Sequence, residues 1–436
     1  MRTAMGAATA EGIVRSPGAS GGGVTRAATG GNIGAAASER LHALDAARGA
    51  MLLLGIVFHA SISFLPSRVP LWIVMDSQRS LTLAVVFHVL HVFRMTAFFV
   101  LAGFFAHMSF HKKGLRGFVG DRLKRIAVPL VVGWPILFAA IIAVSIWGAE
   151  VMSHGGPLPK PPVYPGFPAF PLTHLWFLYV LLLLYAATLI VRGAVALIDR
   201  RGSLRAGVDG IVRRLVENPL GLLVLAAPTA VTLFLTPQWT MWFGIATPDS
   251  SLVPNAGAAV AFFTAFAFGW LLHRQAGLLE IWKRRWLANL AVSLVLTVAG
   301  FAITGIAPLM AYAPHDATTA LYAAVFTISV WTWSFAVIGF AMRFASGYSA
   351  TRRYVADASY WLYLVHVPLV MALQVAVSQL AWPWWAKFAV VLGVTFPVLF
   401  ASYRLFVRYS FIGAILNGRR ESPRAARARL MLEATP

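Results

Sequence analysis

The feature that most constrains this chain is a succession of long apolar stretches that begins after residue 40 and continues to residue 407. A helix that spans a membrane needs about 17–25 mostly apolar residues. Inside a bilayer every backbone polar group must bond within the protein, so such stretches fold as helices. We therefore predict an all-α polytopic membrane helix bundle with about ten transmembrane helices, over residues 44–65, 83–108, 126–149, 172–195, 219–236, 256–272, 286–304, 318–341, 358–378 and 387–407.

The composition agrees with a membrane protein and excludes several other classes. Hydrophobic residues make up 59% of the chain and charged residues 12%, whereas soluble domains average about 45–50% and 25%. A single water-soluble core and general intrinsic disorder are therefore both excluded. The chain has no cysteine, which rules out disulfides, thiolate nucleophiles and cysteine metal sites.

The distribution of basic residues predicts the orientation of the bundle. The formal net charge is +21, which in a soluble protein would suggest a nucleic-acid partner. When the N-terminus is placed in the cytoplasm, Arg94 lies within a span and nearly all other Lys and Arg residues fall in inner segments. The exceptions in outer loops are Arg68, Arg79, Lys160 and Lys387. This alternation follows the positive-inside rule, so we expect both termini in the cytoplasm and no nucleic-acid partner.

Three regions follow from this pattern. Residues 1–40 are rich in Ala, Gly, Ser and Thr and contain no apolar run, so we predict a disordered cytoplasmic tail rather than a signal peptide. Residues 41–410 form the predicted transmembrane domain. Residues 411–436 are basic and are predicted to be a second cytoplasmic tail.

Ionisable side chains in the first two spans are the strongest candidates for function, because such groups are costly in hydrocarbon. Arg48 and His59 are almost three helical turns apart, so they share one face with roughly 16 Å between them along the axis. His88, His91 and Arg94 follow one another at i+3 spacing on the second span. Arg94 lies near mid-membrane without an acid on its own helix, which favours an anionic ligand or a developing oxyanion as its partner. The structural alternatives are a snorkelling Arg48, a packing His59 and an Arg94 bonded to backbone carbonyls.

Later segments add weaker candidates. Ser359, Tyr363 and His366 share a face of the ninth span, where bonding between helices is as good an explanation as function. His174 begins the fourth span and either contacts substrate or faces water. Arg122 and Arg125, one turn apart at the inner surface, suit bidentate phosphate binding; topological charge or lipid head groups explain them equally well. Without a nearby acid, His88 and His91 make a poor metal site, and we predict none.

Five of these segments occur in an order that resembles a known family. They are Arg48 with His59 after ten intervening residues, His91–Phe105 with Arg94 and Gly103, Arg122-Leu-Lys-Arg125 with Pro129, His174-Leu-Trp-Phe-Leu178, and Ser359–His366 with Tyr363. Together they are similar to the motifs of membrane acyltransferases of the acyltransferase-3 family. The resemblance covers nearly the whole membrane part of the chain.

The resemblance implies a multi-pass enzyme of the bacterial inner membrane. It would move an acyl group, succinyl or acetyl, from cytoplasmic acyl-CoA to a hydroxyl of an extracytoplasmic glycan such as a periplasmic glucan. Acyl-CoA would be the donor co-substrate, and no tightly bound cofactor is expected. The expected catalytic residues are His59, as base or transient acyl carrier, Arg94 at the oxyanion, and Arg48. Substrate contacts would come from Arg122, Arg125, His91, His174, Tyr363 and His366.

Two other functions are compatible with the same residues. A secondary transporter of an anionic or sugar solute would use Arg94 as its substrate anchor. Transporters often carry internal repeats with interrupted helices at matching positions, and no such pairing is evident in this sequence. A purely structural scaffold would need neither a mid-membrane arginine nor histidines at matched depth. A geometric check of the acyltransferase hypothesis is whether Arg48, His59, Arg94 and Arg122 line one cavity open to the cytoplasm, as we expect.

Overall fold

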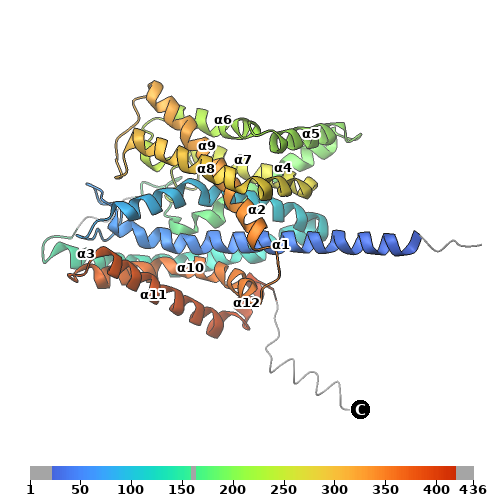
Figure 1. Cartoon of the computed structure of the whole chain (residues 1–436). Coiled ribbons are helices and arrows are strands. Elements are labelled where there is room, and N and C mark those ends of the chain that lie inside the picture. The colour runs from blue at the N-terminus through green and yellow to red at the C-terminus, as the bar shows by residue number, and fades with distance from the viewer. Residues whose placement is uncertain (1–21, 159–163, 419–436) are drawn as a thin grey trace, which may run out of the picture.

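The computed structural model describes residues 22–158 and 164–418 (Figure 1). In this part of the chain the regular structure is helical, and the only β-type pairs are two isolated bridges, Ala169 with Ser251 and Thr240 with Tyr312. The α-helices are α1 (Gly22–Ser61), α2 (Leu81–Arg122), α3 (Val128–Ser153), α4 (Trp176–Ile198), α5 (Ser203–Glu217), α6 (Gly221–Leu235), α7 (Ala256–Leu272), α8 (Leu279–Thr304), α9 (Ala317–Phe344), α10 (Ala350–Ser378), α11 (Trp384–Ser402) and α12 (Phe411–Leu416).

The predicted all-α polytopic membrane bundle is confirmed. Seven helical stretches in the described residues are long and apolar enough to cross a membrane, and an eighth counts if the bent pair α5–α6 is one span. Two of the seven, Leu81–Ser153 and Ala256–Thr304, are continuous helical runs that each contain two of the predicted spans. All ten predicted ranges therefore coincide with helices, while the side of the membrane on which the termini lie stays a prediction.

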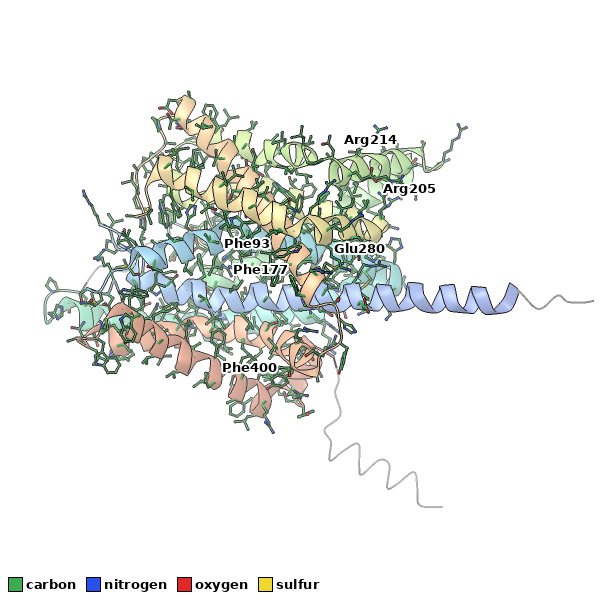
Figure 2. All side chains as sticks on the ribbon, viewed as in Figure 1. Phe93, Phe177, Arg205, Arg214, Glu280 and Phe400 are labelled. Carbon is green, nitrogen blue, oxygen red and sulfur yellow. The ribbon has the colours of Figure 1, made fainter. Side chains whose placement is uncertain are left out.

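Both predicted tails contain residues that the structure describes as helical. Helix α1 begins at Gly22, inside the range predicted as a disordered tail, and residues 1–21 lie outside the described part. The predicted C-terminal tail contains α12, and residues 419–436 are likewise outside. The start of α1 and helices α5 and α12 lie toward the same end of the bundle (Figure 1). Arg205 and Arg214 of α5 lie at that margin, whereas Phe93 and Phe177 lie in the middle of the bundle (Figure 2).

Short polar side chains fix where several helices begin. Ser80, Asn255 and Ser349 accept a hydrogen bond from the backbone N–H three residues further on in α2, α7 and α10. At α9 the carboxylate of Asp316 accepts from Thr319 N at 2.8 Å. These bonds satisfy N–H groups that have no partner inside the helix. The backbone N–H of Thr319 also holds the pKa of Asp316 below its ordinary value.

Glycines let the helices around the centre pack closely. A methyl group at Gly103 of α2 would lie 2.0 Å from the carbonyl oxygen of Phe266, and one at Gly269 of α7 would lie 1.9 Å from that of Val100. The α2 and α7 backbones are thus in direct contact, as small residues allow in membrane bundles. This contact fixes the half of α2 that follows Arg94.

A buried ion pair anchors the loop between α1 and α2. Lys387 Nζ donates to both carboxylate oxygens of Asp76, at 2.9 and 2.8 Å, and to the carbonyl oxygen of Ser378 at 3.1 Å. The Lys387 and Asp76 side chains are 0% and 2% exposed. Lys387, counted from sequence among the outer-loop residues, is thus a buried structural residue that ties this loop to α10 and α11.

Candidate active site

Five polar side chains meet around a small cavity in the middle of the bundle. The cavity has a volume of about 30 Å³ and is lined by α1, α2, α10 and the segment that begins α4. That volume is enough for one water molecule or one substrate oxygen. Its polar lining residues are His59, Arg94, His174, Tyr363 and His366. The structure therefore brings together five residues that the sequence placed on four separate segments.

Two of the three histidines are fixed by carbonyl groups. His366 Nδ1 lies 2.7 Å from the carbonyl oxygen of Tyr363, and His174 Nε2 lies 2.8 Å from that of Leu364. A carbonyl only accepts, so these nitrogens carry the protons and the other ring nitrogens are acceptors in the neutral rings. Tyr363 adds a bond from its hydroxyl to the carbonyl oxygen of His174 at 2.7 Å. The two rings are held 5.5 Å apart between centroids.

His59 differs from its two neighbours. Its ring centroid lies 5.2 Å from that of His366, and its Nδ1 is buried with no hydrogen-bond partner among the described residues. His366 Nε2 is also buried without one. Buried polar atoms nearly always have partners. Unpaired nitrogens around a small cavity therefore indicate a place for a ligand, and His59 is free to take or give a proton there.

Arg94 presents a third unpaired group to the same place. Its Nε is buried without a partner in the described chain, and no ion pair of the described residues includes it. The guanidinium lies over the ring of Phe58, 4.8 Å from the centroid, which offsets part of its charge. A methyl group at Gly55 would lie 2.6 Å from Nη1, so the missing side chain makes room for it. A buried cation without an anion favours a substrate anion or an oxyanion.

A larger cavity adjoins this centre. It has a volume of about 480 Å³, and His59, Arg94 and His174 line it as they line the small one. We call it the outer cavity, after the predicted side of the membrane. Trp72, Trp176 and several hydroxyl groups contribute to its wall, and Asp249 is the acid among its lining residues. Its size and mixed lining are typical of small-molecule sites.

A second large cavity, of about 380 Å³, lies beyond the other side of the centre. We call it the inner cavity. It shares Leu52, Phe98 and Phe177 with the small central cavity, so the three cavities form a series. Its charged lining comprises the bases Arg48, Lys112, Lys113, Arg122, Arg125 and Arg353 and the acids Asp45, Asp121 and Asp357. Bases outnumber acids, which favours an anionic ligand such as a phosphate.

Most cations of the inner cavity already have carboxylate partners. Asp121 lies 2.6 Å from Lys113, 3.1 Å from Arg122 and 3.1 Å from Arg125. Arg48 pairs with Asp45 at 3.2 Å. Arg122 also donates to Ser109 Oγ at 3.1 Å, while its Nε is buried without a partner in the described part.

The expectation that Arg48, His59, Arg94 and Arg122 line one cavity is wrong. His59 and Arg94 line the central and outer cavities, whereas Arg48 and Arg122 line the inner one. Arg48 and His59 share a helix face but lie roughly 16 Å apart along its axis, and the apolar side chains of Leu52, Phe98 and Phe177 lie between the two levels. The role of Arg48 in catalysis stays a prediction, with a place beside Arg122 and Arg125.

The remaining predicted residues take up supporting positions. His91 lines the outer cavity; its ring stacks on Phe58 and Phe87, and its Nε2 lies 3.2 Å from the carbonyl oxygen of Ile245. His88 is 4% exposed and packs against Trp242 and Phe301. Ser359 bonds to Ala356 of its own helix and lines the inner cavity rather than joining His366. In the described residues no group of three His, Asp or Glu side chains is placed to hold a metal ion.

Two residues that line the outer cavity, and a third that is bonded to one of them, were not among the predicted site residues. Trp72 and Asp249 lie in loops and carry no periodic pattern. Gln374 lies inside the ninth span and is 1% exposed, and a polar side chain at that depth was a signal available in the sequence. It bonds to Trp72 and to the end of α1.

Comparison with known proteins decides the family. Residues 41–404 match the profile described as an acyltransferase domain, the acyltransferase-3 family. The chain belongs to the acyltransferase-3 family. This match covers the cavity-lining residues from Arg48 of α1 to α10, whereas Leu416 of α12 and Asn417, which also line the inner cavity, lie beyond it.

Curated relatives align with only part of this acyltransferase-3 protein. Glucans biosynthesis protein C of Escherichia coli (strain SMS-3-5 / SECEC) is 31% identical over 148 residues, which are 34% of this chain and 37% of the relative. The protein of the same name from Salmonella paratyphi B is 29% identical over 147 residues, 34% of this chain and 38% of the relative. The aligned region thus spans less than half of each relative. No solved structure gives a significant match.

Proposed function

We propose that this protein is a membrane O-acyltransferase that transfers an acyl group from acyl-CoA to a hydroxyl of a glycan. The observation that carries the proposal is the series of three cavities, with His59 and unpaired Arg94 in the middle. Family membership supports the reaction class. The name of the relatives supports a glucan as the acceptor. The family supports a place in the bacterial inner membrane, and the basic loops support an orientation with the acceptor outside.

The inner cavity suits the donor. Acyl-CoA carries several phosphates, and the excess of arginine and lysine there would bind them after exchange with Asp121 and its partners. The acyl end would pass Leu52, Phe98 and Phe177, whose apolar side chains border both the inner and the central cavity. The thioester carbonyl would then reach the cavity that Arg94 lines.

The central groups supply the chemistry of transfer. His59 takes the proton from the acceptor hydroxyl while the hydroxyl oxygen attacks the thioester carbon. Arg94 stabilises the negative charge that develops on the carbonyl oxygen. The C–S bond then breaks, the CoA thiolate leaves, and the proton on His59 passes to the sulfur. In the alternative course His59 itself accepts the acyl group and passes it to the hydroxyl.

Substitution of His59 tests this proposal. In membranes given labelled succinyl-CoA or acetyl-CoA, we expect His59→Ala to reduce labelled glycan by about 10²–10⁴-fold, the usual contribution of a general base. His42→Ala is the matched control, because His42 lies on the same helix and lines none of the three cavities. Normal labelling by a well-expressed His59→Ala protein would contradict the proposal.

The transporter predicted as the alternative uses the same features in another way. Cavities on either side of a narrow centre are also what alternating access requires. The two functions differ in the fate of the label. An acyltransferase attaches the acyl group covalently to the glycan, whereas a transporter moves an unchanged solute. Labelled solute inside vesicles, with no labelled glycan, would favour the transporter.

A further inference from the structure

The loop before α7 carries an acid into the outer cavity. Asp249 lies in the segment between Phe243 and Ala256, which is bonded to the segment that precedes α4. Phe170 N donates to Ser250 O at 3.0 Å, and Thr173 N donates to Asp249 O at 3.1 Å. The backbone of Asp249 is therefore fixed directly beside the residue that precedes His174.

The carboxylate of Asp249 is the acidic group of that cavity. Asp249 is exposed and lines the cavity, and partial desolvation of its carboxyl raises its pKa above the ordinary value. No ion pair of the described residues includes it. The other polar groups nearby are hydroxyls, including those of Thr173, Thr247 and Ser250. This part of the cavity therefore offers hydrogen-bond acceptors to a ligand. It does not present the cationic groups that would bind a phosphate.

Trp72 forms another part of the wall, next to His59. The two rings lie 5.7 Å apart between centroids. Trp72 Nε1 donates to Gln374 Oε1 at 2.8 Å, and Gln374 Nε2 donates to the carbonyl oxygens of His59 and Ala60, both at 3.1 Å. One buried amide thus binds both the tryptophan and the last turn of α1, where carbonyls lack helical partners. Gln374 is a positioning residue that fixes Trp72 relative to His59.

We propose that Asp249 and Trp72 form the subsite that holds a saccharide acceptor, an assignment that rests on the proposed acyltransferase function. Asp249 accepts hydrogen bonds from sugar hydroxyls, which carboxylates bind strongly. Trp72 packs its ring against the apolar face of the sugar, because an aromatic ring offers a large flat apolar surface. Held by these two residues in one cavity with His59, the sugar presents another hydroxyl to the base.

The test measures binding without any donor, so it is independent of acyl transfer. The full-length protein in detergent is titrated with a linear gluco-oligosaccharide in a calorimeter. We expect Asp249→Asn to weaken binding about tenfold, the effect of losing hydrogen bonds to a charged acceptor, and Trp72→Leu to weaken it by a similar factor. Glu150→Gln is the matched control, because Glu150 is an exposed acid of α3 outside the cavity lining. It should bind like the unmodified chain.

The outcomes separate this inference from the proposed function. Equal binding by Asp249→Asn, Trp72→Leu and the unmodified chain would overturn the subsite, as would acyl transfer by a protein that does not bind the saccharide. Binding that depends on Asp249 and Trp72, in a protein that transfers no acyl group from any donor, would leave the subsite in place and overturn the acyltransferase. His59→Ala should bind the saccharide normally while losing transfer.

Gln374 has its own readout. Gln374→Leu removes the bonds to Trp72 and to the end of α1 that carries His59. It should therefore lower kcat for transfer more than it raises KM for the acceptor. Gln374→Glu keeps the acceptor for Trp72 and should retain more of the saccharide affinity. If Gln374→Leu and Gln374→Glu changed kcat by the same factor and KM by the same factor, the positioning role would be contradicted.

Discussion

The centre of the bundle and the inner cavity differ in whether their cationic side chains have carboxylate partners. In the inner cavity Asp121 contacts three bases, and Arg48 pairs with Asp45. At the centre no ion pair of the described residues includes Arg94, and its guanidinium lies over the face of Phe58. Paired cations can exchange a carboxylate for a phosphate at little cost. An unpaired, buried cation is expensive, and it is useful where negative charge appears only during the reaction.

The largest effect that sharpens this comparison is expected from crowding Arg94. A methyl group at Gly55 would lie 2.6 Å from its Nη1, so Gly55→Ala must displace the guanidinium. We expect kcat for acyl transfer to fall about 10²-fold, as when one oxyanion donor is lost, with donor KM unchanged. Gly393→Ala is the control, because nothing lies within 4 Å of the added methyl there. Equal activity of the two variants would show that the position of Arg94 does not matter.

A smaller effect, on donor KM rather than on kcat, is expected from a substitution in the inner cavity. Arg122→Ala should raise donor KM about tenfold, the loss of one bond to a charged group, and leave kcat nearly unchanged. Arg200→Ala is the control, since Arg200 is exposed and lies outside the cavity lining. A fall in kcat at saturating donor would place Arg122 in the chemistry and remove the distinction between the two regions.

The smallest effect is a pH dependence at the outer cavity. Partial desolvation of the Asp249 carboxyl raises its pKa above the ordinary value, and the charged form is the better acceptor for sugar hydroxyls. Saccharide affinity should therefore be highest at pH values above this raised pKa, and it should decrease as the pH falls through the pKa. Calorimetric titration at several pH values measures this, and Asp249→Asn should show no such decrease. An identical pH profile for both proteins would contradict the assignment.

The sequence predicted what depends on local spacing. Helices were located because apolar stretches of spanning length leave the backbone no alternative, and Arg94 and His59 were chosen because a charge or an imidazole at that depth is costly. The association of Arg48 with His59 came from a shared face, which carries no information on the apolar side chains between two levels. Asp249 and Trp72 were missed because their positions depend on contacts between loops and on Gln374, more than 300 residues from Trp72 in the chain.

The central claim is that Arg94 acts on the transition state while the paired cations act on donor binding. The most direct test is the single-turnover rate of Arg94→Gln with saturating labelled acyl-CoA, in protein shown to be folded. The account predicts a rate about 10²–10³-fold lower, the cost of one oxyanion donor, with donor affinity unchanged. A normal rate at saturation together with weakened donor binding would contradict it, because Arg94 would then be one more phosphate-binding residue.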